Sequence, residues 1–560
     1  MKIFLAQQNY HIGNFDANTK KIIEAIEEAK KNGSDIIVFS ELTVCGYPAR
    51  DFLEFDDFIS KCNDAIDEIK LHADTIAVVI GAPAKNKILK GKDLFNAAYF
   101  LYDKTVKNIV HKTCLPTYDV FDENRYFEPA YEWNIVEFKG KRLAITICED
   151  IWNLGENPLY RICPMDELMK QNPDLMINIS ASPFDYTHDE DRKAVVKATV
   201  LKYKLPMFYC NAVGSQTEIV FDGSSLVFDK NANLCGEFPS FKEANQSFIL
   251  NENGTIEGQI ITAAADVSDN QFDLQFFDKN LNIEKIYTAI VVSIKDYFFK
   301  MGFTKAIIGS SGGIDSAVTI ALACDALGAA NVKAILMPSQ FSTDHSVADA
   351  EKLSVTLGNP YEIIPIKNIY DAFLTELKPL FKDLPFSVAE ENIQSRTRGN
   401  LLMAIANKFG FILLNTSNKS ELATGYGTLY GDMAGGLSVL GDCYKMQVYS
   451  LAKYINRDKE IIPENIITKP PSAELRPGQK DADSLPDYEV LDKILFQYIE
   501  RRQGPKEIKA QGFDEALVDR ILKMVNINEY KRNQFCPIIR VSPKAFGVGR
   551  RVPIVGKYLS

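Results

Sequence analysis

Hydrophobic and polar residues follow two alternating patterns along the first half of the chain. Short runs rich in Ile, Val, Leu, Phe and Tyr are typical of buried strands, and they occupy residues 2–7, 35–41, 75–83, 94–102, 142–150, 174–182 and 206–214. Segments with apolar residues every three to four positions lie between several of these runs, and one of them ends at the helix breaker Gly33. This alternation of strands and helices predicts a layered α/β fold.

The second half repeats the alternation after a stretch without a clear period. Residues 268–282 are polar and aromatic, with neither helical nor strand spacing, which is typical of a linker. A helix is then predicted over residues 284–303. Further strands are predicted over residues 305–308, 332–339, 361–366 and 410–417.

These patterns divide the chain into three parts. We expect one domain over residues 1–265, a linker over 266–283 and a second domain over 284–560. A chain of 560 residues is also too long for one ordinary hydrophobic core. No repeat of 20–50 residues is evident, so a solenoid is not expected.

Composition and charge narrow the class of protein. The formal net charge of −11 disfavours a nucleic-acid partner held by phosphate contacts. The first residues lack the apolar run of a signal peptide, and no stretch approaches the roughly 18 apolar residues of a membrane span. The ten cysteines show no CxxC pair or metal-finger spacing, as expected where thiols stay reduced. We therefore expect a cytoplasmic protein with neither a nucleic-acid nor a membrane partner.

A glycine-rich turn between a strand and a helix is the strongest local motif of the second half. Its residues are Gly309, Ser310, Ser311, Gly312, Gly313, Ile314, Asp315 and Ser316. Glycines let the backbone approach an anion, and the helix that opens at Ile314 directs free amides toward it. Ser311 and Ser316 add hydroxyl donors. Because Asp315 would repel a phosphate, the motif predicts a magnesium ion together with a nucleotide.

The turn does not match the commonest nucleotide-binding motifs. No lysine follows the glycines, so it is not the GxxxxGK[ST] loop, and the spacing is not GxGxxG. The alternative interpretation is a strand-to-helix turn that binds no ligand.

Several longer segments of the second half resemble known protein families. SGGIDSA at 311–317 resembles the loop of the ATP-pyrophosphatase family, which grips the pyrophosphate of ATP. Four further segments resemble NAD synthetases: ENIQSRTRGNLLM, LLNTSNKSELATGYGTLYGDMAGG, PSAELRPGQKDADSLPDYEVLDKIL and NEYKRNQFCPIIRVSPKAFGVGRRVPI. The resemblance implies a doubly wound parallel sheet that binds ATP and deamido-NAD.

The same resemblance suggests roles for single residues of these segments. It implies that Thr416 contacts ATP, that Asn392 and Lys531 contact deamido-NAD, and that Lys445 faces a phosphate or the leaving group. Glu421 would contact deamido-NAD and, with Asp315, hold Mg²⁺. Taken alone, an Asn, Thr or Lys at such a position is usually a helix cap or a solvated surface group.

Three residues of the first half form a candidate catalytic set. Glu41 follows a strand-like run, Lys112 lies in HKTCLPTYDVFDE, and Cys148 ends the apolar run LAITI. A cysteine at a strand end is often only a small buried hydrophobic residue, and its acidic neighbours do not favour a thiolate. A nucleophilic thiol would need a base for its proton and a cation for the developing oxyanion. Glu41 and Lys112 can supply both.

The segments FSELTVCGYP, KTCLPTYDVFDE and CEDIW resemble the carbon–nitrogen hydrolase (nitrilase) superfamily. That resemblance covers about residues 1–265 and implies a four-layer αββα sandwich. It implies Cys148 as nucleophile, Glu41 as general base and Lys112 as oxyanion stabiliser, with Glu123 as an auxiliary acid or base. Glutamine would be positioned by Tyr118, Ser182 and His188, the last of which stands where the family commonly has a more basic residue.

Joined, the two halves resemble the glutamine-dependent NAD synthetase family over essentially the full length. The resemblance implies that ATP adenylates deamido-NAD and that ammonia from glutamine, carried through the protein interior, displaces AMP. It also implies a homo-oligomer built on a dimer of synthetase domains. Two alternatives stay open: an amide or nitrile hydrolase whose second half serves another acceptor, and a non-enzymatic nucleotide-sensing module.

Overall fold

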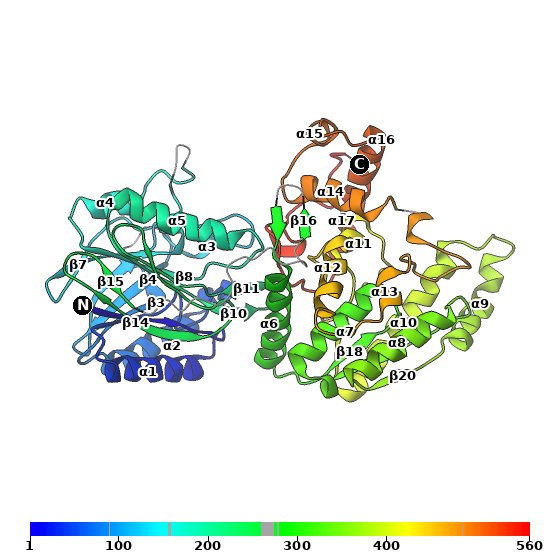
Figure 1. The fold of residues 1–560 in the computed structure, drawn as a ribbon, viewed down its shortest axis with the longest axis horizontal. Helices are drawn as coiled ribbons and strands as arrows, with labels where there is room; N and C mark the ends of the chain where they lie inside the picture. Colours follow the sequence, from blue (N-terminus) through cyan, green and yellow to red (C-terminus); the bar gives the residue numbers. More distant parts are fainter. Residues whose placement is uncertain (89, 155–157, 259–273, 277–278, 484, 560) are drawn as a thin grey trace. The chain divides into compact units, whose positions relative to one another are not determined.

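The protein forms two compact units, Met1–Ser268 and Asp269–Ser560, which are described separately. The computed structural model describes residues 1–560 except 89, 155–157, 259–273, 277–278, 484 and 560 (Figure 1). The side chains of residues 188, 189 and 279 also lie outside the described part. No helix in this part of the chain is long and apolar enough to cross a bilayer.

Two sheets form the centre of the first unit. The larger has the order β15-β14-β1-β2-β3-β4-β5, and the smaller has the order β13-β12-β9-β8-β7-β6. The larger comprises β1 (Lys2–Gln7), β2 (Ile36–Val38), β3 (Ala77–Lys85), β4 (Leu94–Tyr102), β5 (Thr105–His111), β14 (Ala244–Leu250) and β15 (Ile256–Glu257). The smaller comprises β6 (Val136–Phe138), β7 (Lys141–Ile147), β8 (Leu175–Ser180), β9 (Met207–Asn211), β12 (Leu226–Phe228) and β13 (Leu234–Glu237). A separate hairpin pairs β10 (Val213–Gln216) with β11 (Ile219–Asp222).

Helices cover the outer faces of these sheets and give four layers. Side chains from both sheets, among them Ile3 and Ile177, meet in one apolar core. A second core joins the larger sheet to helices α1 and α2, and a third joins the smaller sheet to α4 and α5 (Figure 1). The helices are α1 (Phe15–Lys31), α2 (Asp56–Ile69), α3 (Glu123–Tyr126), α4 (Pro164–Met169) and α5 (His188–Tyr203). The predicted αββα sandwich is confirmed.

A parallel sheet forms the centre of the second unit, in the order β20-β19-β18-β21-β22. Its strands are β18 (Ala306–Gly309), β19 (Val332–Leu336), β20 (Tyr361–Ile363), β21 (Ile412–Asn415) and β22 (Leu437–Ser438). The chain adds strands outward from β18 on one side, then crosses back to β21 on the other. Right-handed crossovers therefore place α7 and α10 on opposite faces, which confirms the doubly wound sheet.

In the second unit, helices lie against this sheet and also beyond its edges (Figure 1). They are α6 (Ile283–Met301), α7 (Ile314–Leu327), α8 (Asp344–Leu357), α9 (Lys367–Phe381), α10 (Val388–Phe409), α11 (Lys419–Thr424), α12 (Lys445–Ile455), α13 (Glu464–Thr468), α14 (Tyr488–Ile499), α15 (Pro505–Lys509), α16 (Glu515–Ile527) and α17 (Glu529–Arg532). Leu402 and Ala406 of α10 pack on Ile307 and Leu413 of the sheet. The predicted start of α7 at Ile314 is confirmed.

Much of the expected linker 266–283 lies outside the described residues. Within its described part, β16 (Leu274–Phe276) pairs with β17 (Lys279–Leu281) in a short antiparallel sheet. Some regular structure therefore exists where the sequence showed no period.

Candidate active sites

Cys148 lies at a sharp turn at the carboxyl end of β7. It opens a short 3₁₀ helix, Cys148–Ile151, and its backbone φ of +43° lies in the region that non-glycine residues rarely adopt. The residue is 4% exposed, so the thiol lies inside the unit. Burial and the nearby Glu41 carboxylate raise the pKa of Cys148 well above its usual value. The thiol therefore needs a base before it can act as a nucleophile.

Lys112 lies between two carboxylates and is fully buried. Its Nζ is 2.7 Å from Oε1 of Glu41 and 2.7 Å from Oε1 of Glu123. Burial alone would lower the pKa of Lys112, but the charges of Glu123 and Glu41 outweigh it and raise the pKa. Lys112 thus stays a cation in a region that excludes water.

Glu41 is held by three groups from distant parts of the chain. Its Oε1 accepts hydrogen bonds from Lys112 and from Nδ2 of Asn96 (2.7 Å), and its Oε2 accepts one from the Ala181 amide (3.0 Å). The backbone beside it touches Gly81 of β3, where the Cβ of any larger residue would lie 2.3 Å from the Leu42 amide nitrogen. Only glycine at position 81 leaves room for the loop that carries Glu41.

Asp150 connects the segment of Lys112 to the turn of Cys148. Its carboxylate accepts hydrogen bonds from the amides of Thr113 (3.0 Å), Cys114 (2.8 Å) and Ile147 (3.0 Å). These hydrogen bonds hold the segment of Lys112 next to the turn of Cys148. The structure thus brings together Glu41, Lys112 and Cys148, the three residues that the sequence predicts as catalytic.

Glu149 and two tyrosines form a polar cluster directly beside Cys148. The hydroxyl groups of Tyr118 and Tyr160 donate to Oε1 of Glu149 over 2.9 and 3.3 Å. Burial raises the pKa of Glu149, while the charge of Lys112 and the two hydroxyl groups oppose that rise. Tyr118 therefore contacts Glu149, the residue next to Cys148. The sequence had suggested no role for Glu149.

Ser182 is buried one residue after Ala181, whose amide contacts Glu41. The Ser182 amide donates to Oδ1 of Asn211 (2.8 Å). His188 is the first residue of α5, and its side chain lies outside the described part of the chain. Its predicted contact with glutamine stays a prediction.

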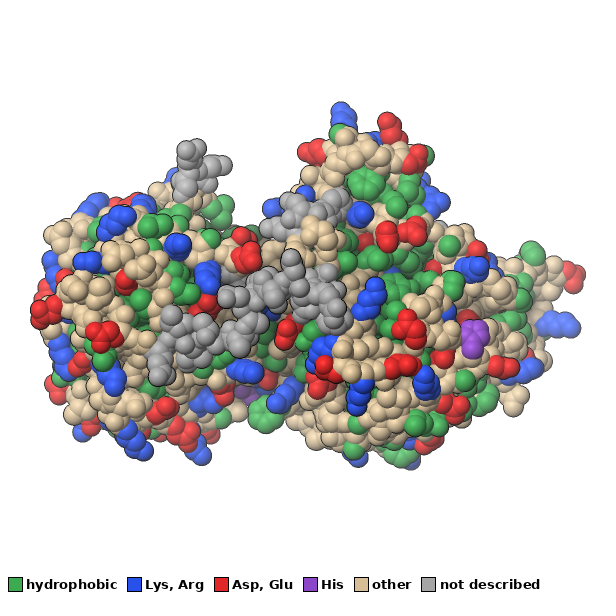
Figure 2. Space-filling model, in the orientation of Figure 1, with side chains coloured by type: hydrophobic (Ala, Val, Ile, Leu, Met, Phe, Trp, Pro, Cys, Tyr) green, Lys and Arg blue, Asp and Glu red, His purple; other side chains and the backbone are tan. Residues whose placement is uncertain are grey.

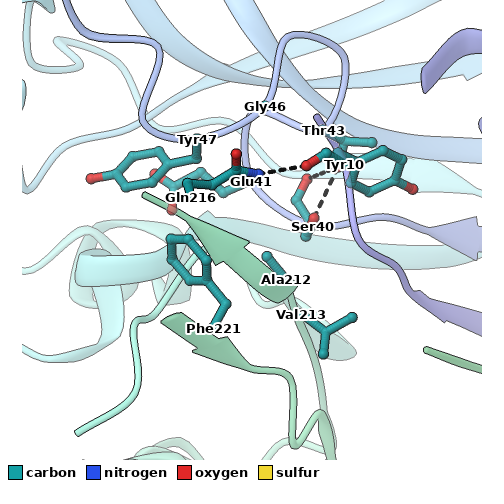
Figure 3. Close-up of a pocket in the computed structure, with 10 residues that line it drawn as sticks. All are labelled: Tyr10, Ser40, Glu41, Thr43, Gly46, Tyr47, Ala212, Val213, Gln216 and Phe221. Carbon is teal, nitrogen blue, oxygen red and sulfur yellow. Dashed lines mark hydrogen bonds between the residues drawn. The ribbon is translucent and has the colours of Figure 1, made fainter. Parts of the chain in front are cut away.

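Glu41 also lines a small pocket (Figure 3). Glu41 is the only charged residue among those that line it. The lining residues are Tyr10, Ser40, Glu41, Thr43, Gly46, Tyr47, Ala212, Val213, Gln216 and Phe221. A small uncharged molecule could therefore lie against the Glu41 carboxylate there.

In the second unit, the glycine-rich turn follows β18 at the point where the strand order reverses. Gly312 has φ +75°, and a Cβ there would lie 2.2 Å from the carbonyl oxygen of Ser346. Ser310 is buried, and its Oγ has no hydrogen-bond partner among the described residues. The first amides of α7 have no carbonyl acceptor within the helix. Unused donors of both kinds therefore gather at this turn, as an anion site requires.

Asp315 contacts a cation and an amide from the segments that follow β22 and β21. Its Oδ2 lies 2.6 Å from Nζ of Lys445, and its Oδ1 accepts from Nδ2 of Asn418 (2.8 Å). Glu421 is close, with Oε1 3.8 Å from the same Nζ. Burial and the charge of Asp315 raise the pKa of Glu421 well above its usual value. Two carboxylates thus share a single lysine.

This pair of carboxylates suits a magnesium ion. Mg²⁺ prefers hard oxygen ligands and commonly takes one or two carboxylates together with substrate phosphates and water. A divalent cation would also relieve the repulsion between Asp315 and Glu421. No group of three or more His, Cys, Asp or Glu side chains suited to a metal occurs in the described residues, so phosphate and water would complete the coordination.

The other predicted ligands of the second unit lie around two neighbouring segments. Thr416 directly follows β21, two residues before Asn418. Asn392 and Lys531 instead hold the segment 425–428: Oδ1 of Asn392 accepts from Thr428 (2.7 Å), and Nζ of Lys531 donates to the Gly425 carbonyl (2.8 Å). The structure gathers Thr416 near Asp315, but it ties Asn392 and Lys531 to backbone and side chains of this loop.

Sequence reasoning left several of these residues without a role. Asn96 was detectable as a polar residue within the apolar run LFNAAYFLY. Asn418 was detectable too, because Asn418 and Glu421 have the spacing of a capping box, and their side chains and amides do bond reciprocally. Glu149 offered only its position beside Cys148.

Comparison with known proteins identifies relatives over the whole length. Residues 2–268 match the carbon–nitrogen hydrolase family, and residues 286–535 match the NAD synthase family. A glutamine-dependent NAD(+) synthetase of Synechocystis is 41% identical over 99% of this chain and 98% of its own, and one of Thermotoga maritima is 38% identical over 100% and 99%. A solved glutamine-dependent NAD+ synthetase from Acinetobacter baumannii, in complex with ADP, has 37% identity and a TM-score of 0.77, over 99% of this chain and 98% of its own.

The contact at Gly81 generates a stability prediction. We expect Gly81→Ala to lower the free energy of unfolding by about 1–3 kcal/mol, because the added methyl group overlaps the backbone of the Glu41 loop. Denaturant unfolding of the wild type and the variant measures this difference. Alkylation of Cys148 should also change in rate, because Glu41 moves. A variant with unchanged stability and unchanged alkylation would contradict the account of this contact.

Proposed function

Since this chain belongs to the glutamine-dependent NAD(+) synthetase family, we propose that the two sites described above carry out the two halves of one synthesis. The first unit hydrolyses glutamine to glutamate and ammonia. The second unit uses ATP to join that ammonia to deamido-NAD, and NAD, AMP and pyrophosphate result. Relatives of this kind over the full length disfavour both an amide or nitrile hydrolase whose second half serves another acceptor and a non-enzymatic nucleotide-sensing module.

Cys148 is the nucleophile of the first reaction. Glu41 takes the thiol proton, and the sulfur attacks the side-chain carbonyl carbon of glutamine. Lys112 stabilises the oxyanion of the tetrahedral intermediate, because its charge lies beside Glu41 in a buried region. The intermediate releases ammonia with the proton that Glu41 carries and leaves a glutamyl thioester. Water, deprotonated by Glu41, then hydrolyses the thioester to glutamate.

Glu149 binds the α-ammonium group of glutamine. It is a buried carboxylate next to the nucleophile, and its neighbours Tyr118 and Tyr160 are uncharged. A charged carboxylate there needs a cation, which the substrate can supply. Ser182 and His188 remain candidates for the other polar groups of glutamine.

The pocket beside Glu41 provides space for ammonia directly after its release. Its lining is largely uncharged, so an ammonia molecule inside it would stay neutral and nucleophilic (Figure 3). In bulk water ammonia is protonated and loses its nucleophilic lone pair. Passage through the protein interior would therefore preserve its reactivity.

The second reaction takes place at the carboxyl edge of the parallel sheet. The turn from Gly309 to Ser316 and Thr416 bind ATP, and the nicotinate carboxylate of deamido-NAD attacks the α-phosphorus and expels pyrophosphate. Ammonia then attacks the carbonyl carbon of the adenylate, and AMP leaves. Asn392, Glu421 and Lys531 bind deamido-NAD, the first and last by shaping the loop 425–428.

Asp315 and Glu421 hold Mg²⁺, which neutralises charge on the phosphates when it is bound. Lys445 balances the two carboxylates until then. Although burial opposes it, the charges of Asp315 and Glu421 raise the pKa of Lys445, so the lysine keeps its proton. It can afterwards face a phosphate oxygen.

We further propose a homo-oligomer built on a dimer of the second units. Large apolar side chains remain exposed at the end of α9 and in the turn to α10, including Leu380 (74% exposed), Leu384 (74%) and Val388 (66%). Figure 2 shows hydrophobic side chains on the surface around this helix. Exposed apolar groups of this size usually meet a partner, and a second copy would cover them.

The protein works in the cytoplasm without a nucleic-acid partner. All ten of its cysteines are free thiols, as in reducing compartments, and the net charge is negative. The supporting observation for the whole proposal is that one chain carries both the Glu41–Lys112–Cys148 site and the Asp315 site. Incubation with deamido-NAD, ATP, Mg²⁺ and glutamine, followed by detection of NAD, tests it directly.

Separate sites predict separable activities. Cys148→Ala should reduce NAD formation from glutamine by more than about a thousandfold, because the nucleophile is lost. Synthesis from ammonium salts should stay within about twofold of the wild type, since the second site belongs to the other unit and shares no residue with the first. Initial rates with each nitrogen source measure both. Equal loss with ammonium salts would show that the thiol serves the synthetase reaction itself.

Glu149 should control glutamine affinity. We expect Glu149→Gln to raise the KM for glutamine about tenfold to a hundredfold, because a hydrogen bond to a charged group contributes about 1.5–3 kcal/mol. Ammonia-driven synthesis should not change. Glu132→Gln removes an exposed carboxylate of the same unit and serves as the control. An unchanged glutamine KM in Glu149→Gln would remove Glu149 from the binding site.

The metal assignment predicts a loss confined to the second reaction. Asp315→Asn should lower ammonia-driven synthesis about a hundredfold, because an amide lacks the anionic oxygen that Mg²⁺ prefers. Glutamine hydrolysis should persist. A magnesium titration of both activities measures the difference, and an unchanged magnesium dependence of synthesis would exclude Asp315 as a ligand.

A further inference from the structure

Arg398 of α10 carries a guanidinium group with no acidic partner among the described residues. Its one hydrogen bond to them runs from Nε to the carbonyl oxygen of Met337 (3.0 Å). The two terminal nitrogens, which form the planar fork of the side chain, remain available. The segment ENIQSRTRGNLLM contributed Asn392 to the sites above, but Arg398 of the same segment has no role in them.

The position of Arg398 follows from the path of α10. Its neighbour Leu402 packs against the start of the glycine-rich turn, with Cδ1 3.2 Å from where a Cβ of Gly309 would lie. Because α10 leads into β21, its amino-terminal end points toward the carboxyl edge of the parallel sheet. Arg398 precedes Leu402 by one turn on the same face, so it lies about 6 Å further toward that edge. Met337, its hydrogen-bond partner, directly follows β19 at the same edge.

The side chain of Arg398 is half-buried, and its charge is not neutralised by a local carboxylate in the described part of the chain. Burial lowers the pKa of Arg398 to about 10, and the charges of Asp432 and Glu474 only partly oppose that shift. The group is therefore still a cation near neutrality. Asp432 accepts a hydrogen bond from the Thr428 amide, and Glu474 accepts from Thr343, so both carboxylates are engaged elsewhere.

We propose that Arg398 binds a phosphate of ATP through its two terminal nitrogens. The inference rests on the proposed binding of ATP at the glycine-rich turn. A guanidinium fork matches the spacing of two phosphate oxygens, and a half-buried cation beside unused amide and hydroxyl donors completes an anion site. Arg398 thereby acts on ATP binding and on the pyrophosphate that leaves.

Two substitutions of Arg398 and one control test this role in ammonia-driven synthesis. Arg398→Gln should raise the KM for ATP at least about tenfold, which corresponds to about 1.4 kcal/mol, and should weaken inhibition by inorganic pyrophosphate similarly. Arg398→Lys keeps the charge without the fork, so a smaller rise is expected. The KM for deamido-NAD should stay within about twofold of the wild type.

Arg396→Gln is the matched control. Arg396 lies two positions earlier in α10, is exposed, and also donates from Nε to a backbone carbonyl, that of Leu429 (3.2 Å). Positions two apart point to different sides of a helix, so this variant should keep the wild-type KM for ATP. Thermal unfolding of all variants verifies folding; if Arg398→Gln does not fold, the Arg398→Lys result decides.

The outcomes separate this inference from the function on which it rests. An unchanged ATP KM and unchanged pyrophosphate inhibition in the folded Arg398 variants would overturn it. A rise in the KM for deamido-NAD alone would overturn it too, because the guanidinium would then bind the dinucleotide. If the wild type makes no NAD from ATP, deamido-NAD and ammonia, the proposed function itself fails.

Discussion

The first site depends on one buried positive charge. An ammonium group inside a protein loses hydration worth several kcal/mol, and removal of one partner of a buried ion pair commonly costs about 3–5 kcal/mol. For Lys112, the carboxylates of Glu41 and Glu123 compensate the lost hydration. Burial raises the pKa of Glu123 to about 7 despite the nearby lysine, so this carboxyl group can hold a proton near neutrality. The cluster can then carry one charge of each sign, and the proposed mechanism assigns to Glu41 the role of accepting the Cys148 proton.

In the second site, a lysine again lies beside two carboxylates. Lys445 balances Asp315 and Glu421 as Lys112 balances its two carboxylates. Lys445 is buried, but its partners Asp315 and Glu421 are partly exposed. Under the proposed function, phosphates and a metal would therefore reach these carboxylates at the amino-terminal end of α7. The cluster around Lys112 is closed, because the side chains of Lys112, Glu41 and Glu123 are almost fully buried. In the proposed reaction, the cluster around Lys445 would instead exchange partners.

Local patterns were enough to predict many of the elements and the positions of the key residues within them. Apolar runs located β1, β3 and β8, and the glycine-rich turn located the start of α7, because each depends on neighbours in the sequence. The strand β5 was missed, because its side chains are largely polar and exposed. The partners of Lys112 could not be derived from local pattern either, since Glu41 lies 71 positions away. Such contacts depend on tertiary structure, and the family resemblance supplied what spacing could not.

Both sites follow a parallel strand and both include a residue with positive φ, but the two residues differ for a physical reason. At Gly312 the carbonyl of Ser346 occupies the space of a Cβ, so the position requires the absence of a side chain. At position 148 the proposed mechanism makes the side chain the reacting group, and glycine could not supply it. Cys148 therefore keeps a backbone conformation that costs about 1–3 kcal/mol for a non-glycine residue, and the hydrogen bonds of Asp150 hold it there. Positive φ at a non-glycine residue is not confined to this position, since Leu42 beside Glu41 also has φ +45°. What sets Cys148 apart is the proposed role of its side chain.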